Sequence, residues 1–117
     1  MQAVLLISHG SHFSKTKREI DSLVRALKKK SGIGIFEYAF LEIEFPSIPE
    51  GIQSCVKKGA SDIIILLNFL NAGRHVDEDI PRIVREAKVK FPHVSIRITA
   101  PVGQHPKIVD LFLDLIK

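Results

Sequence analysis

The stretch that decides the fold is Ala3–Ser8, "AVLLIS", which leads directly into His9 and Gly10. Its apolar residues follow one another without alternating with polar ones. That pattern is typical of a strand covered on both faces, as in a parallel sheet. Three further apolar runs follow along the chain, at residues 35–41, 62–69 and 94–100. The last of these alternates more with polar residues, so we expect it nearer an edge of the sheet.

Each apolar run is followed by a segment with helical spacing. Thr16 and Glu19 have the spacing of a capping box, and Ser47 and Glu50 repeat it. A third helix is expected to begin around Asp79, and Pro106 opens a fourth. The residues expected to face the core from these helices are Ile20, Leu23, Val24 and Leu27; Ile48, Ile52, Cys55 and Val56; Ile80, Ile83, Val84 and Ala87; and Ile108, Leu111, Phe112 and Leu115.

Four consecutive βα units predict an α/β fold with a four-stranded parallel sheet flanked by helices on both faces. A strand order of 2-1-3-4 would place the first and third strands side by side. The chain of 117 residues is the length of one domain, so we expect a single α/β domain over residues 1–117.

The composition narrows the class of protein. Cys55 is the only cysteine, so no disulfide framework is indicated. No apolar run approaches the ~18 residues needed to span a bilayer, and the N-terminus lacks the pattern of a signal peptide. These features favour the cytoplasm and no membrane partner. The net charge of +4 is mild, and without an aromatic stacking pattern or a recognition helix we expect no nucleic-acid partner.

Ligands of open α/β sheets bind beyond the C-terminal ends of the strands. Four of the five histidines are expected at that edge, whereas His93 is expected at the opposite end and is assigned no role. The residues of interest that follow the strands are Ser8, His9, Gly10, Ser11 and His12; Glu42 and Glu44; Asn68, Asn71, Gly73, Arg74 and His75; and Pro101, Gly103, Gln104 and His105.

His9 follows the first strand without a spacer, so its ring is anchored to rigid backbone, which suits a metal ligand or a general base. Gly10 permits a sharp turn or the close approach of a ligand. Glu42 is either a third ligand or proton acceptor, or a solvated loop carboxylate, and His12 is interpreted as a solvated loop residue. Two neutral imidazoles, with or without one carboxylate, suit Co²⁺, Ni²⁺, Zn²⁺ or Fe²⁺.

Several common sites have no signature here. The sequence contains no phosphate-binding loop, no dinucleotide-binding glycine motif, no nucleophile elbow and no HExxH motif. The acidic run Asp77, Glu78 and Asp79 is explained by the positive end of a helix dipole. The histidine positions are therefore the main candidates for chemistry.

Three segments resemble one family: "HGS" after the first strand, "FLEIEFPSIPEGI" after the second, and "NAGRHVDEDIP" after the third. Together they resemble the small CbiX-type chelatases, the ATP-independent class II sirohydrochlorin cobaltochelatases. The resemblance implies insertion of Co²⁺, or Ni²⁺, into sirohydrochlorin in tetrapyrrole and cobalamin biosynthesis. It also implies that His9 and His75 bind the metal. The short members of this family pair as homodimers, in which each subunit matches one lobe of the larger two-lobed enzymes.

On this basis the expected partners are sirohydrochlorin, a divalent metal and a second copy of the chain, with no tightly bound cofactor because the metal is a substrate. A mildly basic protein also suits a macrocycle with eight carboxylates. The apolar faces of the third and fourth helices, or the strand-end loops, are candidates for the contact between copies. The expected catalytic residues are His9, His75 and Glu42, and the expected substrate-binding residues are Ser8, Gly10, Ser11, Gly73 and Arg74.

Two alternatives remain open at this point. A non-catalytic carrier of metal or tetrapyrrole would use the same histidines. A phosphohistidine phosphotransferase would use a histidine after the first strand as nucleophile. That class places an arginine before the histidine, whereas this chain has Ser8, which disfavours it.

Overall fold

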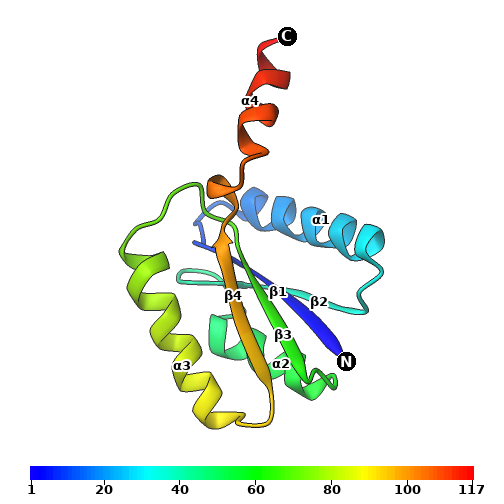
Figure 1. Cartoon of the computed structure of the whole chain (residues 1–117), viewed down its shortest axis with the longest axis vertical. Helices are drawn as coiled ribbons and strands as arrows, with labels where there is room; N and C mark the ends of the chain where they lie inside the picture. Colours follow the sequence, from blue (N-terminus) through cyan, green and yellow to red (C-terminus); the bar gives the residue numbers. More distant parts are fainter.

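In the computed structural model, which describes residues 1–117, the four apolar runs form a single parallel sheet (Figure 1). The strand order is β2-β1-β3-β4, as predicted. β4 lies at one edge, which agrees with its more polar sequence, and β1 and β3 lie in the middle. The strands are β1 (Gln2–Ser8), β2 (Ile35–Phe40), β3 (Asp62–Leu67) and β4 (Ser95–Pro101).

The continuous apolar run of β1 is explained by cover on both sides. Leu5 and Ile7 point into one core and are fully buried, while Val4 and Leu6 point into the other and are at most 5% exposed. Because successive side chains of a strand point to opposite faces, a central strand with two covered faces has no position left for a polar residue. The sequence pattern therefore reflects the central position of β1.

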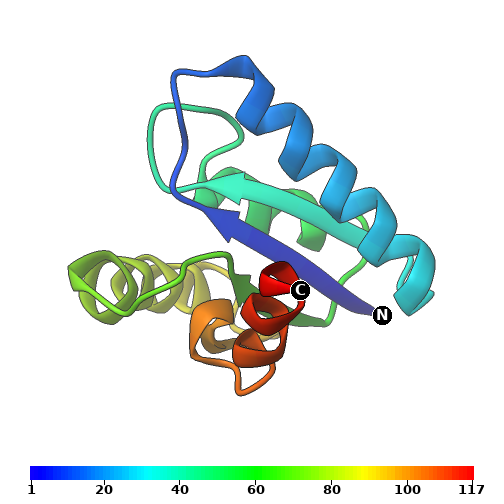
Figure 2. The ribbon, with the colours of Figure 1, turned by 90° about the horizontal axis from the view of Figure 1, so that it is seen from above.

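The helices cover the two faces unequally (Figures 1 and 2). α2 (Ile48–Lys57) and α3 (Ile80–Lys90) pack on one face and complete the larger core. α1 (Ser14–Ser31) packs on the other face, where its buried residues contact β1 and β2. α4 (Ile108–Ile116) projects beyond the body of the molecule (Figure 1), and it contributes no buried residue. No helix combines the length and the apolar character that crossing a membrane requires.

The prediction for the inner face of α4 is therefore wrong. Leu111 and Phe112 are each 57% exposed and Leu115 is 81% exposed. The chain leaves β4 through a short 3₁₀ turn, Val102–Gln104, and then enters α4 in a direction that leads away from the sheet. The helical spacing correctly identified an apolar face, but no part of the same chain covers it.

Two of the predicted helix starts also need correction. α1 begins at Ser14, so Thr16 lies inside the helix and forms no capping box with Glu19. The third helix begins before Asp79, because a π-helical turn, His75–Asp79, runs directly into α3. The capping box of α2 is confirmed: Glu50 N–H donates to Ser47 Oγ at 3.3 Å, and Ser47 N–H donates to the Glu50 carboxylate at 2.9 Å.

Candidate functional site

Three of the predicted site residues come together at the C-terminal edge of the sheet. His9 follows β1, Glu42 follows β2 and His75 follows β3. One potential ligand atom from each of the three lies within 4.8 Å of the other two. The ring centroids of His9 and His75 are 5.2 Å apart. These strands are neighbours in the sheet, which explains why residues distant in sequence form one cluster.

His9 and Glu42 form the first pair of this cluster. His9 Nε2 lies 2.7 Å from Glu42 Oε1, and the two side chains are 47% and 52% exposed. The backbone fixes their relation, since Glu42 N–H donates to the His9 carbonyl at 3.1 Å. Glu42 is therefore a direct partner of His9 and not an isolated solvated carboxylate.

Gly10 allows the loops after β1 and β2 to approach each other. Its φ is +107°, a conformation that residues with a side chain rarely adopt. A Cβ built on Gly10 would lie 1.9 Å from the Glu42 carbonyl oxygen. Next to it, Ser11 N–H donates to the Glu44 carboxylate at 2.8 Å. Of the two roles considered for Gly10, the sharp turn is present, and the group that approaches it is the backbone of Glu42.

His75 has its own carboxylate partner, which the sequence interpretation missed. His75 Nδ1 and Asp79 Oδ2 form a hydrogen bond of 2.8 Å along the π-helical turn. Asp79 thus occupies Nδ1 of His75 and leaves Nε2 free of this contact. The bond also fixes the orientation of the ring. The helix dipole alone does not account for this contact of Asp79. The available signal was the i,i+4 spacing of His75 and Asp79, which places two side chains on one helical face.

The remaining predicted residues lie around this cluster at different depths. Ser8 is 6% exposed, and its hydroxyl accepts a hydrogen bond from Asn68 Nδ2 at 3.1 Å. Gly73 and Arg74 are exposed and directly precede His75, and the Arg74 guanidinium lies 3.6 Å from Glu78. The rings of His9 and Phe69 lie in a T-shaped arrangement, with their centroids 6.5 Å apart.

The other histidines are not part of this cluster. His12 is exposed in the loop before α1. His93 lies between α3 and β4, at the opposite end of the sheet. His105 is exposed at the base of α4, where its Nδ1 accepts a hydrogen bond from Lys107 N–H at 3.1 Å.

The cluster offers two imidazoles and one carboxylate. These donors suit a borderline divalent ion of the first transition row, and three protein ligands leave coordination positions for other groups. All three side chains are about half exposed, from 45% to 52%. A large ligand can therefore reach the same ion from the solvent side.

An open parallel sheet with such a cluster beyond three adjacent strands has the architecture of one chelatase lobe. The chain matches the CbiX family over residues 3–117. It therefore belongs to the CbiX family, which confirms the resemblance noted in the sequence.

Two relatives with assigned activities are similar over nearly all of this chain. A chloroplastic sirohydrochlorin ferrochelatase of Arabidopsis thaliana is 33% identical over 114 residues, which are 97% of this chain and 51% of that protein. A sirohydrochlorin cobaltochelatase of Sulfolobus acidocaldarius is 32% identical over 111 residues, 95% of this chain and 86% of that protein.

The fold also matches a solved structure, that of the sirohydrochlorin chelatase SirB from Bacillus subtilis subspecies spizizenii in complex with cobalt. The TM-score is 0.89 at 29% identity, over 98% of this chain and 49% of SirB. The present chain thus spans about half the length of SirB and of the Arabidopsis protein. This likeness confirms the predicted chelatase-like fold of one lobe.

Proposed function

We propose that residues 1–117 act as one chelatase lobe that inserts a divalent metal, Co²⁺ or alternatively Ni²⁺, into sirohydrochlorin without ATP. The observation that carries the proposal is the cluster of His9, Glu42 and His75, whose ligand atoms lie within 4.8 Å of one another. Membership of the CbiX family and relatives named sirohydrochlorin chelatases support the substrate. Because those relatives are named for both iron and cobalt, Fe²⁺ belongs in every test of the metal.

Metal insertion must remove two pyrrole protons and strip water from the ion. His75 is suited to bind the metal through Nε2, because Asp79 already engages Nδ1. His9 is the second metal ligand, and Glu42, 2.7 Å away, is suited to accept a proton from it or from a pyrrole N–H. The two imidazoles thus have different carboxylate partners, and only the partner of His9 lies among the potential metal ligands.

Weak binding of the metal favours this reaction. With three half-exposed ligands the ion keeps open positions, and the macrocycle nitrogens can displace its remaining waters one at a time. The metal is then a substrate that leaves with the product. No tightly bound cofactor is part of the proposal.

The loops around the cluster are suited to bind the macrocycle. Ser11, Gly73 and Arg74 lie beside it, and the 81%-exposed Arg74 side chain can meet a substrate carboxylate. Gly10 and Ser8 contribute through the shape of the site, since Gly10 turns the first loop and buried Ser8 is bonded to Asn68. A flat tetrapyrrole needs two walls to lose most of its water, so we propose that the lobe works as a homodimer.

The test is metal insertion into sirohydrochlorin, followed by the absorbance of the macrocycle, with Co²⁺, Ni²⁺ and Fe²⁺ compared side by side. His9→Ala and His75→Ala should each reduce the rate by at least about tenfold, because each removes a ligand or base. His93→Ala is the matched control and should leave the rate unchanged. Full insertion rates in both variants at limiting metal would show that the proposed mechanism is wrong.

The same assay separates the alternative of a carrier. A carrier would bind the metal or the macrocycle without raising the rate above that of the mixture lacking protein. Insertion by the unmodified chain at a rate proportional to its concentration would exclude that alternative.

A further inference from the structure

A hollow lined by cationic side chains lies between α1 and β2, and its volume is about 510 Å³. Lys17, Arg18 and Arg25 of α1 line it, and Asp21 is the one acidic residue that does so. Asp21 already has a partner, because its Oδ2 lies 2.9 Å from Arg25 Nε. The charges of Lys17 and Arg18 therefore remain uncompensated within the hollow.

Lys17 and Arg18 contact neutral groups. Lys17 Nζ lies 6.0 Å from the centroid of the Phe40 ring, and Arg18 Nη1 donates to the Ser14 hydroxyl at 3.3 Å. Lys17 is partly buried, whereas the other lysines of α1 are exposed. A cation that loses part of its hydration gains most from an anion that accepts its hydrogen bonds. This pair is therefore a candidate binding group for an anion.

Tyr38 of β2 adds a neutral hydrogen-bond donor to the same hollow. Burial, followed by the nearby charge of Asp21, raises the pKa of its hydroxyl, so the hydroxyl stays protonated at neutral pH. Ammonium and guanidinium groups are donors only, and a protonated tyrosine also donates. The matching ligand is an anion with several acceptor oxygens.

The hollow adjoins the loops of the candidate site. Phe40, beside which Lys17 lies, ends β2 two residues before Glu42. In Figure 2 the loop that follows β1 leads directly into α1, beside the loop that follows β2. The charge of Glu44, in the second of these loops, also raises the pKa of Tyr38 and so acts on the hollow. A macrocycle whose metal is bound at the cluster can therefore extend over the start of α1.

The acidic residues beside the cluster require compensation if a polycarboxylate is to bind there. Glu42 and Glu44 both lie in the loop after β2, and their carboxylates repel those of a bound macrocycle. Lys17 and Arg18 lie next to that strand and offset this repulsion. Arg74 lies in the loop after β3, on the opposite side of β1. A flat macrocycle above the cluster would thus meet positive charge at two opposite edges.

We propose that the hollow between α1 and β2 binds peripheral carboxylates of the macrocycle through Lys17 and Arg18. The inference rests on the proposed function, which identifies the macrocycle. Neither side chain belongs to the cluster of His9, Glu42 and His75, so both act on binding and not on the chemical step. The hollow thereby favours a tetrapyrrole rich in carboxylates over one with few, which makes Lys17 and Arg18 determinants of specificity.

Binding of metal-free sirohydrochlorin, followed by the absorbance of the macrocycle, tests the hollow directly. In a variant that combines Lys17→Met and Arg18→Met, both charges are lost while the apolar stems are kept. The dissociation constant should rise by about 5–30-fold, as expected for two partly exposed charge contacts. In the insertion assay KM should rise by a similar factor, with kcat unchanged at saturating macrocycle.

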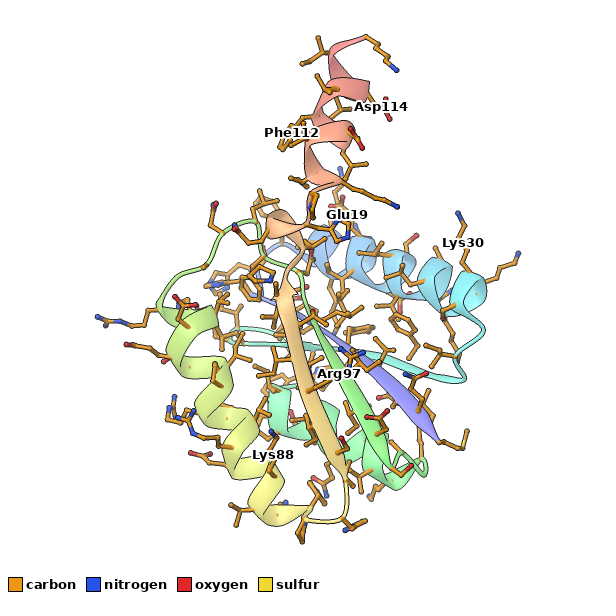
Figure 3. The ribbon with its side chains drawn as sticks, viewed as in Figure 1. Glu19, Lys30, Lys88, Arg97, Phe112 and Asp114 are labelled. Atoms are coloured by element: carbon orange, nitrogen blue, oxygen red, sulfur yellow. The ribbon has the colours of Figure 1, made fainter.

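The matched control combines Lys29→Met and Lys30→Met. It removes the same net charge from the same helix, but at the far end of α1, where Lys30 extends into solvent (Figure 3). Neither residue lines the hollow, so the dissociation constant should change by less than about twofold. A variant that combines Lys17→Arg and Arg18→Lys keeps both charges and should bind the macrocycle nearly as well as the unmodified chain.

The octamethyl ester of sirohydrochlorin separates charge from shape. It keeps the ring and carries no carboxylate, so it should bind equally to the unmodified chain and to the double variant of Lys17 and Arg18. If the ester loses as much affinity as the free acid, the substitutions act through the fold and the inference is overturned. Equal dissociation constants of the free acid for this double variant and for the control would also overturn it.

Metal insertion, measured on the same samples, keeps the two proposals apart. If the unmodified chain inserts metal and the Lys17 and Arg18 double variant does so with the same KM, the proposed function stands and this inference is wrong. If the unmodified chain binds the macrocycle without inserting metal and the double variant binds it more weakly, this inference stands and the proposed insertion is refuted. Absence of both binding and insertion overturns both proposals.

Discussion

His9 and His75 lie side by side, with ring centroids 5.2 Å apart, but different backbone elements hold them. His9 is fixed by the end of β1 and lies 2.7 Å from Glu42, a residue of another loop. His75 is fixed by a helical turn and bonds to Asp79 within that turn at 2.8 Å. The hydrogen bond to Asp79 restricts the tautomer and the orientation of the His75 ring, whereas Glu42 is a close charged neighbour of His9. The two histidines are therefore expected to respond differently to loss of their partners.

Asp79→Asn tests the partner of His75. The amide keeps the shape of the carboxylate but is a weaker acceptor, so the His75 ring should lose orientation and basicity. Loss of such a partner typically reduces metal affinity by about 10–100-fold. Titration with Co²⁺ should show that decrease while circular dichroism and the thermal midpoint stay unchanged. Asp77→Asn, on an exposed residue of the same turn, should bind Co²⁺ normally. Equal affinities in both variants would show that Asp79 does not position the ligand.

Glu42→Gln tests proton transfer. The substitution keeps the size of the side chain and its contact with His9 but removes the negative charge that accepts a proton. If Glu42 acts as proton acceptor, insertion should slow by about 10²–10⁴-fold at saturating metal. Glu86→Gln on α3 is the control and should insert metal at the normal rate. A decrease that disappears at high metal concentration would instead indicate that Glu42 serves only as a ligand.

At the scale of elements, the sequence predicts the strands and helices that have an apolar pattern, but it does not predict the helical turn formed by a mostly polar segment. The strands were found because each is an apolar run, and the Ser47–Glu50 box was found because its residue types are specific. The turn His75–Asp79 contains one buried residue, Val76, so it shows no apolar stripe. The apolar pattern therefore predicts a helix start at Asp79 and gives no sign of the hydrogen bond between Asp79 and His75.

The loop after β1 depends on Gly10, which Gly10→Ala tests. The added methyl group meets a positive φ of +107° and a backbone oxygen 1.9 Å away, which cannot rotate aside. The free energy of unfolding should decrease by at least about 2 kcal/mol, from conformational strain and displacement of the loop. Urea denaturation measures this change. Gly34→Ala, where nothing lies within 4 Å of the new Cβ, should differ from the unmodified chain by less than about 1 kcal/mol. Similar stabilities would contradict the close approach of the two loops.

At the scale of the whole molecule, the βα pattern predicts the strand order and the position of the candidate site. It does not predict how the sheet face on the side of α1 is covered. Periodicity shows that α1 and α4 each have an apolar face, and it cannot show which chain buries that face. Leu23 is consequently 40% exposed and Leu115 is 81% exposed in a single chain. The molecule is also elongated, with extents of 48 × 32 × 29 Å. The larger core, between the sheet and the helices α2 and α3, is by contrast complete within one chain.

The reactivity of Cys55 tests whether that core is fully closed to solvent. Its side chain is fully buried between α2 and the sheet. Burial, followed by the nearby negative charge of Glu37, raises the pKa of the thiol to about 12. Because the thiolate is the reactive species, native Cys55 at pH 8 should react with a disulfide reagent only when the core opens. The reaction should be at least about 10³-fold slower than in urea-unfolded chain, which serves as the matched reference.

The same burial predicts a pH dependence of stability. In the unfolded chain Cys55 loses its proton near its ordinary pKa of 9.0, whereas in the folded chain the pKa is about 12. The folded state therefore binds more protons between these values, and the free energy of unfolding should fall as the pH rises above about 9. This contribution is fully present below pH 9 and is lost as the pH approaches 12. Urea denaturation at pH 8, 9 and 10 should show a steeper decrease for the unmodified chain than for Cys55→Ala, which lacks the thiol. Parallel pH profiles for the two proteins would show that Cys55 is not buried beneath α2 as the structure places it.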